Sequence, residues 1–404
     1  MHRLATCRAR RAATAARHAP ALFLLLALST GARAFDWQVE LTPAGELFPV
    51  LALSQPARHA GLLLVRVSGA DAPAVVSVRV ETEGLAQPAY ARSADAAPSR
   101  VLRPTLVWDV SALRQLRAAR RQPLRVTLEA PGLRESRLLE VRLHPLDDAP
   151  YFVREGGDRV DLGWVFAAYV DPHAAAVDAA LASARAHDAA FDVDTDADPH
   201  ARDRRRVHAV WSALERRGLA YAGGDPALAR GPAVWSQRVR LPDDTWRDRR
   251  ANCIDGSVLL ASVFERLGLH AFIVLVPGHA FVGYAHADGT REFLETTLLG
   301  APAPGLDADV RAARNVEAAR RAGRARWRSA AARLDGRHAP AWALIDIGTA
   351  RAYGIIPLAV GDRANTTSAA SRRDGTDRSA GNPCVAHGGR PSCPRADVAQ
   401  RNTR

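Results

Sequence analysis

The chain changes its hydrophobic period near residue 150, and this change limits most strongly how it can fold. Before that point, segments such as "AVVSVRVETEG" and "LRVTLEAPG" alternate apolar with polar or charged residues, as half-buried strands do. After it, "HAAAVDAALASARAHD" and "RRRVHAVWSALERRGLAY" carry apolar residues at helical spacing. The pattern therefore predicts an all-β domain followed by a mixed α+β domain.

The length of 404 residues is enough for two folded domains with tails. We predict a β-sandwich of the immunoglobulin-like type over residues 35–150, because several short strands are punctuated there by Gly and Pro. Residues 151–360 are expected to form the α+β domain. Residues 361–404 contain almost no apolar side chains and are expected to be a disordered tail.

Residues 1–34 have the pattern of a signal peptide. A basic start precedes the apolar stretch "APALFLLLALSTG", and "ARA" at residues 32–34 has the small-x-small form of a cleavage site. The apolar stretch is too short to cross a bilayer, and no later stretch reaches about 18 apolar residues. We expect a periplasmic or secreted protein of bacterial type, with no integral membrane segment after signal removal.

The net charge of +12 does not predict a nucleic-acid-binding protein. All 55 basic residues are arginine, which fits a GC-rich coding sequence. They are mixed with acidic residues along the chain or lie in the signal and the tail, and form no single stripe. We therefore expect no nucleic-acid partner.

The four cysteines differ in their surroundings. Cys7 lies in the signal segment, while Cys384 and Cys393 lie in the tail and can pair across a short loop. Only Cys253 falls in a well-patterned region. An unpaired cysteine in an exported protein is either buried and inert or retained for its chemistry.

Cys253 is predicted to open a helix. Asn252 can cap this helix, and Asp255 at its third position completes a start that resembles a capping box. The thiol then lies at the positive end of the helix dipole, where a thiolate is favoured. The negative charge of the Asp255 carboxylate disfavours a second negative charge on the nearby thiol, so a positively charged partner is needed to stabilise the thiolate.

His279 is the candidate partner and follows a Pro-Gly turn at the end of an apolar strand. The next segment reads as a hairpin around residues 287–289. With a three-residue loop, Phe281 lies opposite Glu295, so that His279 and Glu295 are diagonal neighbours on one face. A two-residue loop would reverse the faces.

The pieces "NCIDGSVLLASVFERLGL", "PGHAFVGY" and "FLETT" together resemble the transglutaminase-like, papain-type family of cysteine enzymes. The resemblance implies that Cys253 is the nucleophile, His279 the general base and acid, and Glu295 the group that orients the imidazole. In this family the acid is usually aspartate, so Asp288 and Asp346 are alternatives to Glu295. The aromatic residue after the histidine is also displaced by one position.

This resemblance implies an exported cysteine hydrolase or acyltransferase that attacks a peptide or amide carbonyl and needs no cofactor. The backbone N–H of Cys253 is the first candidate donor to the oxyanion. The side chain of Gln237 or Trp235, upstream in "VWSQRVRLP", is a weaker second candidate. The alternative function is a catalytically inactive module of the same fold that binds a cell-envelope protein or polymer.

Two segments contain residue types that bind metals, but we expect no metal site at either. A zinc site would need Cys253, His279 and His286, but the two histidines are seven residues apart on one strand and point to opposite faces. The acidic "DVDTDADPH" at residues 192–200 lacks the glycine and the final glutamate of a calcium loop. We interpret it as a solvated connector.

Overall fold

The structure is a computed structural model that describes residues 36–358, apart from residues 56–62, 70–74, 96, 98, 156, 194–197, 224–227, 232 and 339. The predicted signal peptide, the tail and its two cysteines lie outside the described residues. The described chain is mixed α+β, as predicted, and it divides into two compact units. The first comprises residues up to 165 with 224–239 and 336–340, and the second comprises 166–223, 240–335 and the residues from 341 on.

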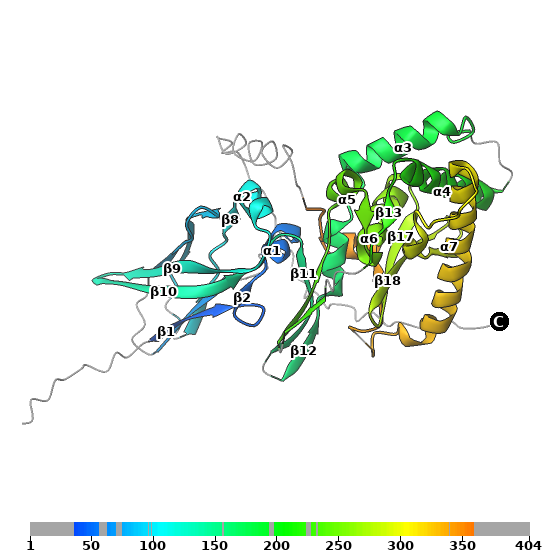
Figure 1. The fold of residues 1–404 in the computed structure, drawn as a ribbon. Coiled ribbons are helices and arrows are strands. Elements are labelled where there is room, and N and C mark those ends of the chain that lie inside the picture. Colours follow the sequence, from blue (N-terminus) through cyan, green and yellow to red (C-terminus); the bar gives the residue numbers. More distant parts are fainter. Residues whose placement is uncertain are drawn as a thin grey trace, which may run out of the picture. The chain divides into compact units, whose positions relative to one another are not determined.

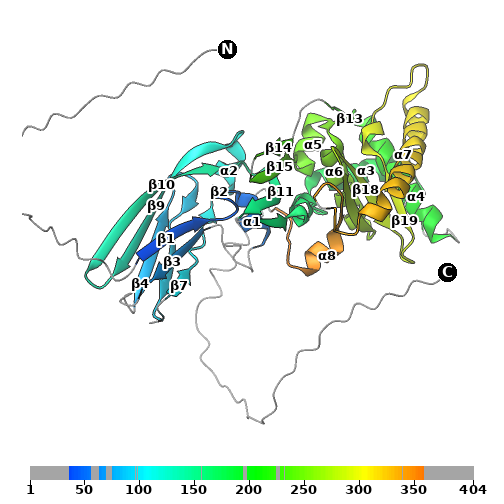
Figure 2. The ribbon, with the colours of Figure 1, turned by 90° about the horizontal axis from the view of Figure 1, so that it is seen from below.

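The first unit is built almost entirely from antiparallel sheets. A five-stranded sheet has the order β2-β10-β9-β4-β6, and a three-stranded sheet has the order β1-β3-β7. Side chains along β3 and β4 alternate between buried and partly exposed, which is the period that the sequence predicts. The long β9–β10 hairpin is visible in Figures 1 and 2. The elements are β1 (Asp36–Leu41), β2 (Glu46–Leu47), α1 (Pro49–Ser54), β3 (Leu63–Ser68), β4 (Val76–Glu81), β5 (Ala86–Gln87), β6 (Ala89–Ser93), β7 (Ser99–Leu102), β8 (Val107–Trp108), α2 (Val110–Gln115), β9 (Arg120–Ala130) and β10 (Leu133–Leu143).

The first unit continues past the predicted boundary at residue 150. A further four-stranded sheet has the order β12-β11-β15-β14. Its strands are β11 (Asp148–Glu155), β12 (Asp158–Asp161), β14 (Leu228–Arg230) and β15 (Val234–Arg238). Because β11 pairs with β15, residues from well inside the predicted second domain are drawn into the first unit.

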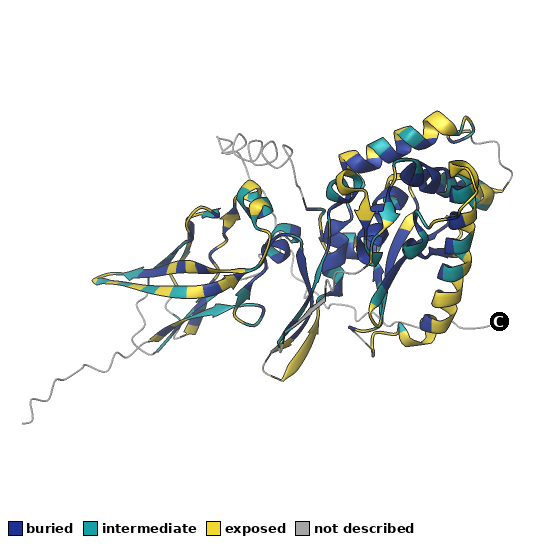
Figure 3. Cartoon of the chain, in the orientation of Figure 1, coloured by how far each residue is buried: buried dark blue, intermediate teal, exposed yellow. Residues whose placement is uncertain are grey.

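The second unit contains a four-stranded antiparallel sheet of order β19-β18-β17-β20. Helix α6 packs on one face, where the ring of Phe264 lies 4.9 Å from that of Tyr284. Helix α7 packs on the other face, where Trp327 stacks on Phe293 at 4.3 Å. Figure 3 shows the burial of α6 and the central strands.

The short helix η2 (Gly163–Tyr169) begins in the first unit and ends in the second, and the other elements of the second unit follow it. They are α3 (Ala175–His187), α4 (Pro199–Arg216), β13 (Ala220–Tyr221), α5 (Pro242–Asp248), β16 (Arg250–Ala251), α6 (Cys253–Arg266), β17 (His270–Val276), β18 (His279–Ala285), β19 (Arg291–Leu294), η3 (Thr296–Leu298), α7 (Ala308–Ala330), η4 (Ala331–Arg333), β20 (Ala343–Asp346) and α8 (Ile347–Ala352). None of the helices formed by the described residues is both long enough and apolar enough to cross a membrane.

The β18–β19 hairpin has the register that a three-residue loop predicts. The N–H of His286 donates to the carbonyl of Thr290 at 2.9 Å, and Ala285 pairs with Arg291. The pairing continues to Val282 and Leu294, which places the next position, 281, opposite residue 295. His279 and Glu295 therefore share one face of the sheet, as predicted.

Candidate active site

The start of α6 is fixed by a complete capping box. The Oδ1 atom of Asn252 accepts hydrogen bonds from the N–H groups of Ile254 and Asp255 at 3.0 and 2.9 Å. The Asp255 side chain accepts from the N–H of Asn252 at 3.1 Å. These interactions do not use the N–H of Cys253, the first residue of the helix, whose free thiol is partly buried.

The carboxylate of Asp255 is occupied by Arg240, which sequence reasoning did not single out. The Arg240 N–H donates to Oδ1 at 2.8 Å, and its guanidinium lies 3.0 Å from Oδ2. Burial raises the pKa of Asp255, and these bonds oppose that effect. Arg240 therefore supplies positive charge that offsets the Asp255 carboxylate near the thiol.

His279 is the first residue of β18, and its imidazole hydrogen-bonds both the thiol of Cys253 and the carboxylate of Glu295. Its Nε2 atom lies 3.0 and 2.9 Å from the Oε1 and Oε2 atoms of Glu295, and its side chain also hydrogen-bonds with Cys253. Because the carboxylate uses Nε2, Nδ1 is the nitrogen available to the thiol. Burial lowers the pKa of His279, but the hydrogen bonds with Cys253 and Glu295 outweigh it and raise the pKa to about 9. The imidazole is therefore positively charged at neutral pH.

Glu295 is held in place by groups from two further elements. It caps η3, where the Thr297 N–H and hydroxyl donate to its Oε1 atom at 3.2 and 2.9 Å. Arg326, from α7, forms an ion pair with Oε2. Burial alone would raise the pKa of Glu295, but the hydrogen bond with His279 is the main cause of a net lowering. The carboxylate that faces His279 is therefore ionised and fixed.

The structure does not bring either alternative acid to His279. Asp288 is exposed and interacts with His200 at 3.0 Å and with Thr290. Asp346 caps α8 and lies 2.9 Å from His270, at the other end of β17. Of the three acidic candidates, only Glu295 hydrogen-bonds with His279.

The first turn of α6 packs tightly against η3. The Thr296 hydroxyl donates to the carbonyl of Cys253 at 3.1 Å, and the Ser257 hydroxyl donates to the same oxygen at 2.7 Å. A Cβ atom at Gly256 would lie 3.0 Å from the Cβ atom of Thr296. The absence of a side chain at Gly256 therefore lets the segment that carries Glu295 approach the helix that carries Cys253.

Tyr221 is a further residue at this site that the sequence did not reveal. It pairs with Ala251 in the short β13–β16 ladder, and its N–H donates to the carbonyl of Leu299, just after η3, at 2.8 Å. Burial is the main cause of a raised pKa of Tyr221, followed by the negative charges of Cys253 and Glu295. Its phenol therefore lies within electrostatic reach of both groups.

The predicted second oxyanion donors lie in the first unit, on β15. The Gln237 amide donates to the carbonyl of Arg238 at 3.0 Å. Trp235 lies on the same strand, and its ring contacts that of Phe152 at 5.2 Å. The role of either side chain toward the oxyanion stays a prediction.

His286, the third residue that a zinc site would need, has partners away from Cys253 and His279. Its Nδ1 atom lies 2.7 Å from Asp203 and its Nε2 atom 3.4 Å from Glu292. Among the described residues, no group of three or more His, Cys, Asp or Glu side chains is arranged to hold a metal ion.

A scan against models of protein families and a search of curated proteins both find no match. The site geometry and the sequence patterns of this chain are therefore what support a function for it.

Proposed function

We propose that the protein is an exported cysteine hydrolase or acyltransferase of the transglutaminase-like type, acting on a peptide or amide carbonyl. The observation that carries the proposal is the hydrogen-bonded series Cys253, His279 and Glu295, with the cysteine at a capped helix start. A buried, ionised carboxylate that orients an imidazole beside a thiol is the arrangement that activates a nucleophilic cysteine.

In the proposed reaction, the positive charge of His279 and the start of α6 stabilise the Cys253 thiolate. The thiolate attacks the carbonyl carbon, and the negative oxygen that forms accepts a hydrogen bond from the N–H of Cys253. The Tyr221 hydroxyl is a second candidate donor. His279 then gives its proton to the leaving amine as the C–N bond breaks, which leaves a thioester on Cys253.

The second half-reaction releases the acyl group. Neutral His279 takes a proton from water, or from an acceptor amine, as that nucleophile attacks the thioester. The Cys253 thiolate leaves, and the imidazolium is restored. Glu295 keeps the imidazole in one orientation through both steps, and Thr297 and Arg326 keep Glu295 in place.

The finer fold assignments belong to the same proposal. A transglutaminase-like fold for the second unit is supported by the order of its parts, with a cysteine on α6, a histidine on β18 and an acid after β19. An immunoglobulin-like sandwich for the first unit is supported by its antiparallel sheets of alternating burial. Export is supported by the signal-like pattern of residues 1–34.

The test is acylation by p-nitrophenyl acetate, a small activated ester. We expect a burst of p-nitrophenolate equal to the enzyme concentration, and one acetyl group on Cys253 by peptide mass spectrometry. Cys253→Ser should abolish the burst. Added hydroxylamine then measures how the thioester divides between water and an amine-type acceptor. Acetylation of Cys253 no faster than that of the unfolded chain would refute the proposal and leave a binding module as the function.

A further inference from the structure

A buried histidine of the first unit, His144, lies directly after β10, where the chain passes toward β11. Its Nδ1 atom lies 2.7 Å from Oδ2 of Asp148, the first residue of β11, and its Nε2 atom lies 2.6 Å from Oε2 of Glu46, the first residue of β2. Its side chain is 7 % exposed. The imidazole therefore connects the end of β10 with β2 and with the start of β11, which lie close together in Figures 1 and 2.

The two carboxylate contacts together require the charged form of the His144 ring. A neutral imidazole carries one N–H, so its other nitrogen would present a lone pair to a carboxylate oxygen. In the imidazolium both nitrogens donate, and both distances are those of charge-assisted hydrogen bonds. Burial lowers the pKa of His144, but the hydrogen bonds with Asp148 and Glu46 outweigh it and raise the pKa above the ordinary value of 6.5.

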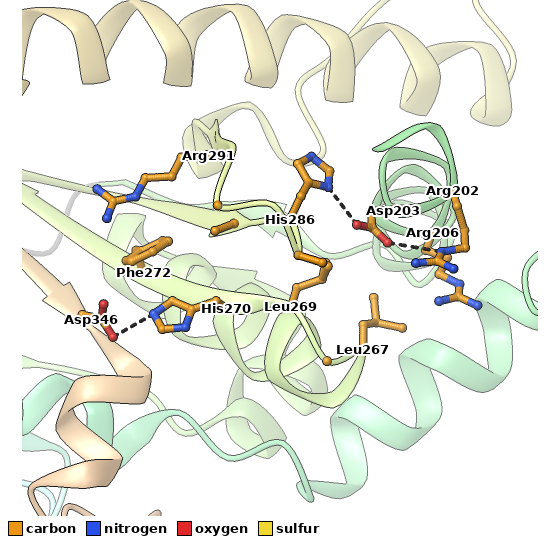
Figure 4. A pocket seen from close by; sticks show the side chains of 14 residues that line it. Arg202, Asp203, Arg206, Leu267, Leu269, His270, Phe272, His286, Arg291 and Asp346 are labelled. Atoms are coloured by element: carbon orange, nitrogen blue, oxygen red, sulfur yellow. Dashed lines mark hydrogen bonds and ion pairs between the residues drawn. The ribbon is translucent and has the colours of Figure 1, made fainter. Parts of the chain in front are cut away.

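Two histidines of the second unit, which line the pocket in Figure 4, have less demanding surroundings. His270 contacts Asp346 through Nε2 at 2.9 Å. His286 lies 2.7 Å from Asp203 but 3.4 Å from Glu292. A single N–H is enough for the one short contact of each ring. His144 differs from both because a carboxylate oxygen lies within 2.7 Å of each of its ring nitrogens.

The His144 contacts hold a strand that has few other hydrogen bonds. β2 contains two residues and pairs with β10 through Glu46 and Leu47. The His144 N–H donates to the carbonyl of Leu47 at 2.9 Å, and the ring of Phe48 stacks on the imidazole with 3.8 Å between ring centres. The charged ring is therefore a large part of what attaches β2 and the following residues to the end of β10.

The other charged groups on the neighbouring elements are not histidines. Burial is the main cause of a raised pKa of Asp147, and the guanidinium of Arg238, 2.5 Å away, opposes it. Arginines stay charged over the range in which a histidine titrates. Those on the elements packed against His144 are Arg238 on β15, opposite Asp148, Arg142 on β10, opposite Glu46, and Arg120 on β9, opposite Leu143. The imidazole is therefore the group of this cluster that is suited to change its charge near neutral pH.

We propose that His144 is a pH-sensitive switch in the first unit, which holds β2 and the start of β11 against the end of β10 while its ring is charged and releases them when the ring loses its proton. The neutral ring leaves one buried carboxylate facing a lone pair, so that contact is lost. Because the pKa is raised on folding, the stabilisation is complete below pH 6.5 and is lost as the pH rises through the higher pKa of the folded protein. The switch does not depend on the chemistry proposed for Cys253.

The first test is an NMR titration of the full chain with ¹³C-labelled histidine. We expect a midpoint for His144 above 6.5. Glu46→Gln should lower this midpoint, because one of the two carboxylates that stabilise the imidazolium is lost. Glu140→Gln, at an exposed position on β10, is the matched control and should leave the midpoint unchanged. A midpoint at or below 6.5, or an equal change in both variants, would overturn the proposal.

The second test is hydrogen exchange of peptides that contain β2 and residues 144–148, measured relative to β4 in the same sheet as β2. The ratio to β4 cancels the intrinsic dependence of exchange on pH. We expect relative exchange to become about tenfold faster as the pH rises through the midpoint of His144. His144→Gln has no charge to lose and should show fast relative exchange at every pH. His187→Gln, an exposed histidine at the end of α3, should keep the pH-dependent change. A pH-dependent change that persists in His144→Gln, or no change in the unchanged protein, would overturn the proposal.

Discussion

The carboxylate that faces His279 can be tested by converting it to its amide. Glu295→Gln keeps the size of the side chain but removes the negative charge that stabilises the imidazolium. The side chain is 3 % exposed, so water does not replace the lost charge. Arg326 loses its partner too, but its side chain is 47 % exposed and can be solvated. The main effect should therefore fall on His279.

The size of the effect follows from the pKa of His279. The difference between the ordinary value of 6.5 and about 9 corresponds to about 3 kcal/mol of stabilisation of the charged form. Cys253 and Glu295 together supply at least this amount, because they also outweigh the opposing effect of burial, so the carboxylate contributes on the order of 1–2 kcal/mol. Because the pKa is raised on folding, the stabilisation is complete below pH 6.5 and is lost as the pH rises through about 9.

The measurement is urea unfolding of both proteins at about pH 6, 8 and 10. Glu295→Gln should be less stable at the lowest of these values by about 1–2 kcal/mol, and the difference should shrink toward the highest. Glu215→Gln is the control, because Glu215 is also buried and its side-chain partners, Trp211, Asn315 and Arg311, keep the same charge throughout this pH range. A loss in Glu295→Gln that is equal at all three pH values would refute the coupling between Glu295 and His279.

Three further substitutions test the surroundings of the thiol. Gly256→Ala places a Cβ atom 3.0 Å from Thr296, so it should cost about 1–3 kcal/mol and slow the labelling of Cys253; an unchanged thermal midpoint would contradict this. Asn252→Ala removes the helix cap and should lower the free energy of unfolding by about 1 kcal/mol in urea; no measurable loss would count against the cap. Tyr221→Phe should slow acetylation by p-nitrophenyl acetate about tenfold or more but leave alkylation by iodoacetamide unchanged, because alkylation forms no oxyanion. Equal slowing of both reactions would instead indicate a structural role for the hydroxyl.

Those parts of the candidate site that depend on local rules could be predicted from the sequence. The capping box at Asn252 and Asp255 involves residues three apart, so the residue types alone predict it. The proximity of His279 and Glu295 follows from the length of one loop and the two-residue period of a strand. Both predictions needed no knowledge of the rest of the chain.

The parts that were missed come from distant segments. The site receives Arg240 from the segment just before α5, Arg326 from α7 and Tyr221 from β13. No local pattern distinguishes Arg240 and Arg326 among the 55 basic residues of the chain. The first unit extends beyond the predicted domain boundary at residue 150 for the same reason, because β11 pairs with β15, a strand far from it in the sequence. Long-range pairing depends on the whole fold and not on the pattern of either strand.

The most direct test of an activated Cys253 is its rate of alkylation by iodoacetamide as a function of pH. The rate is measured on the folded protein and read at Cys253 by peptide mass spectrometry, which separates it from the other cysteines. We expect a rate already near its maximum at about pH 7, because the imidazolium of His279 and the start of α6 favour the thiolate, whereas an ordinary thiol ionises near pH 8.5. His279→Ala should move the profile to that ordinary value. A thiol that reacts only after unfolding, or with the same pH profile in both proteins, would contradict the account.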